Sequence, residues 1–211
     1  MFMEENEDRY QRIIEQIYVI FMQHGIKNVS MDDLCRQMGI SKKTLYKYVD
    51  NKTDLLKKIS QYIQDLITTR LKNLDDLNLN AIDILLEMSR VTTDNHIRIN
   101  PMVSFEIRKY YPQVYDSYLC TKKEAIVNSI LQNLDKGIKE GLYRKDLNKE
   151  IVAHLYFKKV EEFHTLEGDE LQNFSYSKIF EVMFENHIRG IANEKGIAYF
   201  EKQKAKLNFN I

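Results

Sequence analysis

The stretch from Ser30 to Lys52 constrains the fold more than any other, because it predicts two short helices joined by a tight turn. Ser30 and Asp33 have the spacing of a capping box, in which both side chains accept hydrogen bonds from backbone N–H groups at a helix start. Gly39 favours the end of this helix, since glycine readily adopts a positive φ. Ser41 then predicts the cap of a second helix.

Apolar spacing gives each of these helices one buried face. The first helix has apolar residues at intervals of three and four: Met31, Leu34, Cys35 and Met38. In the second helix, Leu45 and Val49 lie four residues apart, which predicts that this pair docks on the first helix. The other sides of the second helix are left for solvent or a partner.

Those other sides carry basic, hydroxyl and phenol groups, which suit the phosphates and base edges of DNA. The residues expected to contact DNA are Ser41, Lys42, Lys43, Thr44, Tyr46, Lys47, Tyr48 and Lys52. Thr44, the two tyrosines and Lys52 are expected at phosphates. The other three lysines are candidates for guanine edges in the major groove, or for backbone contact alone. An ordinary solvated helix face is the alternative interpretation.

Charge supports a local rather than a global attraction to nucleic acid. The 31 basic and 31 acidic residues leave a formal net charge of zero. Basic residues nevertheless outnumber acidic ones between Arg36 and Lys58, whereas Glu4, Glu5 and Asp8 lie in an acidic N-terminal segment. Any affinity for DNA must therefore come from the cluster around the two short helices.

The rest of the chain predicts helices and no strands. Apolar residues make up 44% of the 211 residues and there are only two prolines, which suits a large helical fold. Helical spacing or helix-start and helix-end signals occur over residues 8–23, 53–74, 81–97, 101–109, 113–140, 148–166 and 173–192. A weaker pattern over 194–206 predicts either a docked helix or a loose tail. The expected fold is all-α, with a three-helix helix-turn-helix domain (1–54) followed by a larger helical domain (55–211).

Other classes of protein lack support in the sequence. Cys35 and Cys120 lie far apart in predicted helices, which argues against a disulfide scaffold. There is no secretory signal and no apolar run of the roughly 18 residues that a membrane span needs, so we expect a soluble cytoplasmic protein with no membrane partner. The five histidines lack the spacing of a metal site, and no catalytic motif or cofactor-binding loop is present. We therefore expect neither an enzyme nor a metal or cofactor.

The segment S-M-x-D-L-x-x-x-M-G-I-S-K-x-T-L-Y-x-Y, followed by N-K-T-D-L-L, resembles the TetR/AcrR family of bacterial transcriptional regulators, over roughly Ile13 to Leu56. The resemblance implies a homodimer with a small DNA-reading domain and an all-α domain that binds a small-molecule effector. Effector binding in such proteins usually releases the operator. Two residues depart from the family pattern: Lys43 stands where glycine is frequent, and Val49 where an aromatic residue usually closes the helix.

Aromatic and sulfur-containing side chains are frequent in the middle of the chain and suit an apolar ligand cavity with a few polar anchors. The candidate ligand-binding residues are Tyr62, Met88, His96, Met102, Phe105, Tyr110, Tyr115, Tyr118 and Tyr156. Plain core packing is the alternative for each of them.

Two amphipathic helices near the C-terminus are candidates for a subunit interface, because two helices from each chain can form a four-helix bundle across a twofold axis. The candidate residues are Ile151, Leu155, Val160, Phe163, Phe180, Phe184 and Ile188. Burial within one subunit is the alternative. DNA binding itself favours a dimer, since two recognition helices about 34 Å apart read a pseudo-palindromic operator. The rival function is a helical protein-interaction module whose helix-turn-helix does not bind DNA.

Overall fold

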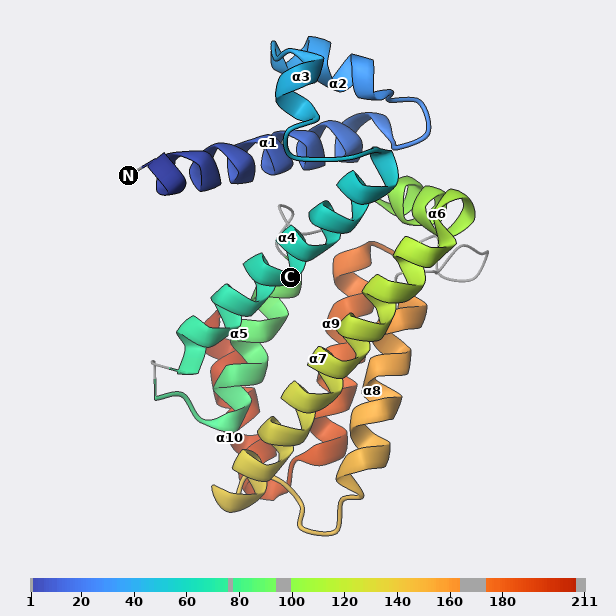
Figure 1. Ribbon diagram of the computed structural model, residues 1–211. Coiled ribbons are helices and arrows are strands. Elements are labelled where there is room, and N and C mark those ends of the chain that lie inside the picture. The colour runs from blue at the N-terminus through green and yellow to red at the C-terminus, as the bar shows by residue number, and fades with distance from the viewer. Residues whose placement is uncertain (1, 76–77, 94–99, 164–173, 208–211) are drawn as a thin grey trace. The chain divides into compact units, whose positions relative to one another are not determined.

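The computed structural model describes residues 2–75, 78–93, 100–163 and 174–207 (Figure 1). Over these ranges all the regular elements are helices, which confirms the all-α prediction. They are α1 (Phe2–His24), α2 (Met31–Met38), α3 (Lys42–Leu45), α4 (Lys52–Asp75), α5 (Ala81–Thr93), α6 (Pro101–Tyr110), α7 (Pro112–Lys139), α8 (Lys149–Phe163), α9 (Tyr176–Ile191) and α10 (Glu194–Leu207).

The helix boundaries follow the expected ranges closely, with two differences. α1 begins at Phe2 rather than near Asp8. The regular part of α3 is a single turn, whereas the sequence pattern continued to Val49. The segment over 194–206 is a docked helix rather than a loose tail, since Phe200 of α10 is fully buried.

The helices form two compact units, which we describe separately. Unit 1 comprises Met1–Thr68 and Ile99–Lys122, and unit 2 comprises Thr69–Arg98 and Lys123–Ile211. α4 and α7 each run from one unit into the other. This division differs from a single cut after residue 54, because α6 and the start of α7 belong with the helix-turn-helix. A functional boundary at residue 54 stays a prediction.

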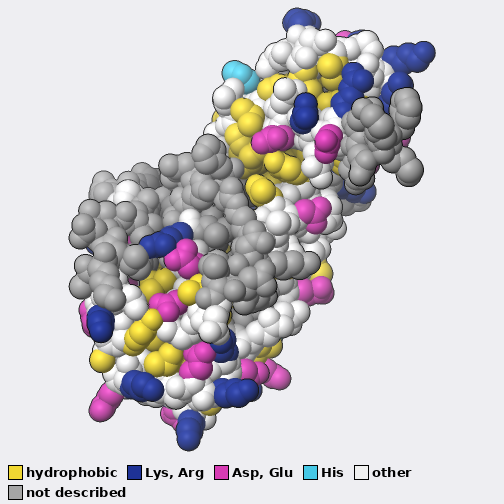
Figure 2. Space-filling view, turned by 90° about the vertical axis from the view of Figure 1, so that its left-hand side faces the viewer, with side chains coloured by type: hydrophobic (Ala, Val, Ile, Leu, Met, Phe, Trp, Pro, Cys, Tyr) yellow, Lys and Arg dark blue, Asp and Glu magenta, His cyan; other side chains and the backbone are white. Residues whose placement is uncertain are grey.

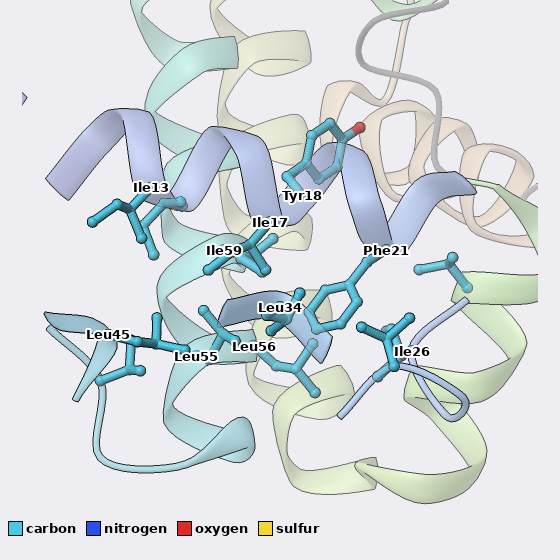
Figure 3. Close-up of a cluster of buried hydrophobic side chains, with 14 of the residues drawn as sticks. Ile13, Ile17, Tyr18, Phe21, Ile26, Leu34, Leu45, Leu55, Leu56 and Ile59 are labelled. Atoms are coloured by element: carbon cyan, nitrogen blue, oxygen red, sulfur yellow. The ribbon is translucent and has the colours of Figure 1, made fainter. Parts of the chain in front are cut away.

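Unit 1 is organised by the apolar face of α1. Figure 3 shows Ile17 and Phe21 of α1 pointing toward Leu34 of α2, with Leu55 and Leu56 of α4 beside them. All of these side chains are buried. Each such burial contributes about 1.5–3 kcal/mol, so the cluster holds α1, α2 and the start of α4 together.

Packing and hydrogen bonds at the turn that follows α7 connect several elements of unit 2. The ring of Tyr143 lies directly on Gly137, where a Cβ atom would come within 2.1 Å of the ring. The Tyr143 hydroxyl donates to Oδ1 of Asn133 at 3.0 Å, and Nδ2 of Asn133 donates to the carbonyl of Ala81 at 2.8 Å. Burial raises the pKa of Tyr143, which keeps this hydroxyl a neutral donor. A buried polar chain thus joins α5, α7 and the turn.

Candidate nucleic-acid interface

The caps that position α2 are formed as the sequence predicts. Oγ of Ser30 accepts a hydrogen bond from the Asp33 N–H at 3.1 Å, and Asp33 accepts one from the Ser30 N–H at 3.0 Å. The Ser30 hydroxyl also donates to Oδ2 of Asp33 at 2.5 Å, and the hydrogen bonds from this hydroxyl and from the Ser30 N–H lower the pKa of the Asp33 carboxyl. Gly39 ends the helix with φ of 62°. The capping box and the glycine stop are both confirmed.

α3 is also capped as predicted, and the apolar side chains of this segment are buried. Oγ of Ser41 accepts from the Thr44 N–H at 3.1 Å. After Leu45 the regular α-helical pattern stops, since the N–H groups of Lys47 and Tyr48 donate to carbonyls only three residues back, at 3.4 and 2.9 Å. Leu45 and Val49 are buried, which confirms the predicted docking.

Five of the eight candidate DNA contacts lie exposed on this element: Ser41, Lys42, Lys43, Tyr46 and Lys47. Lys and Arg side chains project at the upper end of the space-filling view, where Figure 1 labels α2 and α3 (Figure 2). Tyr46 is 47% exposed, a large apolar surface for a solvated position. Lys42 pairs with Asp32 at 2.8 Å, which raises the pKa of Lys42. Exposed ion pairs of this kind are weak, so a phosphate can replace Asp32.

Thr44 and Tyr48 are half-buried beside that surface. The ring of Tyr48 packs against Tyr10 of α1, with ring centroids 5.9 Å apart. The carbonyl of Tyr48 accepts a hydrogen bond from Nζ of Lys58 at 2.5 Å. Tyr48 therefore contributes to the packing of the helix-turn-helix as well as to its edge.

Lys52 makes contacts inside unit 1 that differ from the predicted phosphate contact. Its Nζ donates to the carbonyls of Ile26 and Val29 at 2.5 and 2.6 Å, so it holds the loop between α1 and α2 from inside unit 1. Burial lowers the pKa of Lys52. These contacts give Lys52 a structural role within unit 1, and its predicted contact with a phosphate stays a prediction.

Glu106 of α6 binds the same loop, and it was not among the functional residues predicted from the sequence. One carboxylate oxygen accepts hydrogen bonds from the N–H groups of Ile26 at 2.5 Å and Lys27 at 2.9 Å. The side chain is only 7% exposed. No local signal could have indicated it, since its partners lie about 80 positions away in the sequence. We call the contacts of Glu106 and Lys52 to residues 26–29 the loop clamp.

Unit 1 also contains a cavity of about 40 Å³. Of the candidate ligand-binding residues, Tyr115 and Tyr118 line it. Tyr62 is half-buried elsewhere in unit 1, and Met88 and Tyr156 are half-buried in unit 2. His96 lies outside the described residues. The three candidates on α6 are exposed rather than in a cavity: Met102, Phe105 and Tyr110. For these three, a role in ligand binding stays a prediction.

The candidate interface residues divide into outward and inward groups. Ile151 and Leu155 of α8 are 55% and 58% exposed, and Val160 is half-buried. The candidates on α9 are instead buried within the chain, which corrects their assignment to a subunit surface: Phe180, Phe184 and Ile188. The side chain of Phe163 lies outside the described residues. Val182 of α9, which was not predicted, is 50% exposed.

No group of three or more His, Cys, Asp or Glu side chains in the described ranges could hold a metal ion. No helix there combines the length and the apolar character needed to cross a membrane.

Comparison with known proteins agrees with this geometry. Residues 13–59 match the family described as "Bacterial regulatory proteins, tetR family". An HTH-type transcriptional regulator of Staphylococcus aureus (strain USA300), SAUSA300_2515, is 27% identical over 125 residues, which cover 53% of this chain and 66% of that relative. The uncharacterized HTH-type regulator YvaF of Bacillus subtilis (strain 168) is 22% identical over 191 residues, or 88% of this chain and 96% of the relative.

Solved structures share the fold. A putative TetR-family transcriptional regulator from Rhodococcus sp. superposes with a TM-score of 0.67 at 17% identity, covering 89% of this chain and all of that one. The matched segment 13–59 contains the second half of α1, all of α2 and α3, and the first part of α4, the elements that build the exposed surface described above. Residues 13–59 thus match the helix-turn-helix domain of the TetR family, and over most of its length the chain is similar to HTH-type transcriptional regulators.

Proposed function

We propose that this chain is a cytoplasmic, homodimeric repressor that binds a pseudo-palindromic operator and is released by a small-molecule effector. The observation that carries the proposal is that the segment 41–49, which comprises α3 and the turns beside it, has one buried and one exposed side. Leu45 and Val49 anchor it in the core, while Lys43, Tyr46 and Lys47 project into solvent. A rigidly mounted polar and basic element of this kind suits the major groove.

The exposed groups differ in what they offer to DNA. Lys43 and Lys47 can neutralise phosphates or donate to guanine O6 and N7, and Tyr46 can donate to a phosphate oxygen. Ser41 is already occupied by its cap and by the Thr44 hydroxyl at 2.8 Å, so it supports the element more than it offers a free donor. Lys43 and Lys47 are therefore the main candidates for affinity.

A dimer supplies the second reading head. Ile151 and Leu155 lie one turn apart on α8, and both are more than half exposed, while Val182 on the neighbouring α9 is 50% exposed. Apolar side chains in this arrangement suit burial against the same helices of a second copy. The proposed interface therefore consists of outward residues of α8 and α9.

The experiment is a gel shift with the DNA upstream of the chain's own gene, repeated at increasing salt. We expect a steep loss of affinity with salt, because phosphate contacts release bound counterions. Lys47→Ala should weaken binding and reduce the slope of log K against log salt by about 1. Lys145→Ala, which removes an exposed lysine of unit 2, is the matched control and should change neither.

Salt-independent binding would contradict the proposal, as would no binding to any upstream fragment. The second result would favour the protein-interaction module instead, in which Lys47→Ala would affect only a protein partner.

A further inference from the structure

One lysine of the candidate DNA-binding surface differs from its neighbours because it already has an anionic partner. Nζ of Lys42, in α3, lies 2.8 Å from Oδ2 of Asp32, in the first turn of α2. Lys43 and Lys47 are exposed as well, but in the part of the chain that the structure describes neither makes an ion pair. Among the three lysines considered for base edges, Lys42 therefore has to give up a carboxylate before it can bind DNA.

The pair lies where a helix-turn-helix meets DNA. In this motif the first residues of the second helix reach the base edges, while the first helix crosses the phosphate backbone. α2 and α3 lie side by side in unit 1 (Figure 1). Lys42 is the first residue of α3 and Asp32 is the second residue of α2. Asp32 therefore holds a negative charge close to where phosphates would approach Lys42.

The exposure of the pair allows Lys42 to exchange partners at a small cost. The Lys42 and Asp32 side chains are 63% and 54% exposed, and ion pairs in water are weak and screened by salt. A phosphate that offers an equally exposed contact gains nothing over Asp32. An acceptor that is held firmly against α3 and shielded from water does gain, so it can displace the carboxylate.

An operator and a random sequence differ in which of these acceptors they provide. Binding to random DNA rests on screened attraction to phosphates, whereas an operator also presents base edges that the recognition element fits. When Lys42 leaves Asp32, the carboxylate is left facing DNA without a cation. An unpaired charge of this kind penalises every complex that does not compensate it, which is one way to create specificity.

We propose that Asp32 is a specificity-determining residue, which retains Lys42 when the chain is on random DNA and releases it to the operator. The inference rests on the proposed function, because it requires that the chain reads an operator. It divides the three lysines into two roles. Lys43 and Lys47 attract any DNA, and Lys42 adds affinity for the operator alone.

The experiment measures the affinity of the full chain for two labelled duplexes of equal length by fluorescence anisotropy, at about 0.1 M salt. One duplex is the upstream DNA that the wild type shifts in a gel, and the other has a random sequence. In Asp32→Asn we expect affinity for the random duplex to rise at least about threefold, and the operator-to-random ratio to fall at least about twofold. The slope of log K against log salt on the random duplex should steepen by about 0.9, because the freed Lys42 neutralises one more phosphate.

Lys42→Ala tests the other half of the pair. It should weaken operator binding at least about threefold and leave affinity for the random duplex within about twofold of wild type. Its salt slope on the random duplex should stay unchanged, because Lys42 and Asp32 together carry no net charge. Loss of affinity for both duplexes by the same factor would overturn the proposal.

Two controls separate this role from a general effect of charge. Asp50→Asn makes the same change at an exposed aspartate that follows the recognition element and forms no ion pair with another described residue. It should raise affinity for both duplexes by a similar factor and leave their ratio unchanged. In a Lys42→Ala background, Asp32→Asn should no longer change the ratio, because Asp32 acts through Lys42. A ratio that still falls in this background would overturn the proposal.

A purely structural ion pair between α2 and α3 predicts the opposite sign. Its loss would loosen α3, so Asp32→Asn would bind both duplexes more weakly, and that result would overturn the proposal. We expect its melting temperature to stay within about 2 °C of wild type, since the capping box of Ser30 and Asp33 is untouched. An unchanged ratio in Asp32→Asn, while the wild type prefers the operator, would overturn the role of Asp32 alone. A wild type that prefers no upstream fragment over random DNA would overturn the proposed function as well.

Discussion

Removing the carboxylate of Glu106 should destabilise unit 1 far more than its single side chain suggests. Glu106→Ala leaves two backbone N–H groups without an acceptor, and that of Ile26 is in the buried core. Hydrogen bonds to a charged group contribute about 1.5–3 kcal/mol each, and a buried donor left unpaired costs about 1–3 kcal/mol. Lys52 also loses a nearby negative charge. Because these contributions overlap, we expect the free energy of unfolding to fall by about 3–4 kcal/mol.

The assay is thermal and urea unfolding at pH 7, followed by circular dichroism. A loss of this size lowers the melting temperature by roughly 6–16 °C in a chain of this length. Glu106→Gln keeps an acceptor oxygen and should lose about half as much. Glu15→Ala removes an exposed carboxylate of α1 and should stay within about 0.5 kcal/mol of wild type.

A local measurement separates the clamp from general destabilisation. Amide hydrogen exchange at Ile26 and Lys27 should accelerate in Glu106→Ala relative to Leu34, whose environment in α2 is otherwise unchanged. Exchange that is unchanged at the two loop amides, together with a melting temperature within about 2 °C of wild type, would refute the role assigned to Glu106.

Three further predictions follow from other parts of the structure. Gly137→Ala places a Cβ atom 2.1 Å from the ring of Tyr143, so it should cost about 1–3 kcal/mol in urea unfolding, with partial recovery in Gly137→Ala/Tyr143→Leu. Gly190→Ala, where nothing lies within 4 Å, should instead gain about 0.5–1 kcal/mol, and equal stabilities for the two alanine variants would contradict the packing. Burial lowers the pKa of His187 to about 4, so between that value and the usual 6.5 the unfolded chain binds the extra proton and stability falls as the pH drops. The full loss from pH 7 to below 4 is about 3 kcal/mol. His187→Leu should remove this part of the pH dependence, and an unchanged profile would count against it. Leu155→Lys should shift the chain from dimer to monomer in light scattering and weaken operator binding, whereas Gln113→Lys on α7 should do neither. A dimer that survives Leu155→Lys would place the interface elsewhere.

The sequence by itself determined the features that depend on neighbours within one or two helical turns. The caps at Ser30, Asp33 and Ser41 and the stop at Gly39 all have partners within four residues, so a local pattern is sufficient to predict them. The same holds for the buried side of α3. The sequence also predicts the exposed part of the candidate DNA-binding surface, because the residues opposite the buried side face solvent.

The sequence could not determine which apolar face packs inside the chain and which remains outside. α8 and α9 both carry apolar stripes, yet Ile151 and Leu155 are exposed while Phe180 and Phe184 are buried. Helical periodicity indicates that a face is apolar but says nothing about which neighbour covers it. The same limit applies to the candidate ligand-binding residues, of which those on α6 lie at the surface.

The tertiary structure alone decided the role of the loop clamp and the position of the cavity. Lys52 reads as one more basic residue beside the helix-turn-helix, but its partners lie 23 and 26 positions away. The partners of Glu106 lie 79 and 80 positions away. Hydrogen bonds within a turn are set by spacing along the chain, whereas contacts between distant segments depend on how whole helices pack, because only that packing brings their side chains within reach.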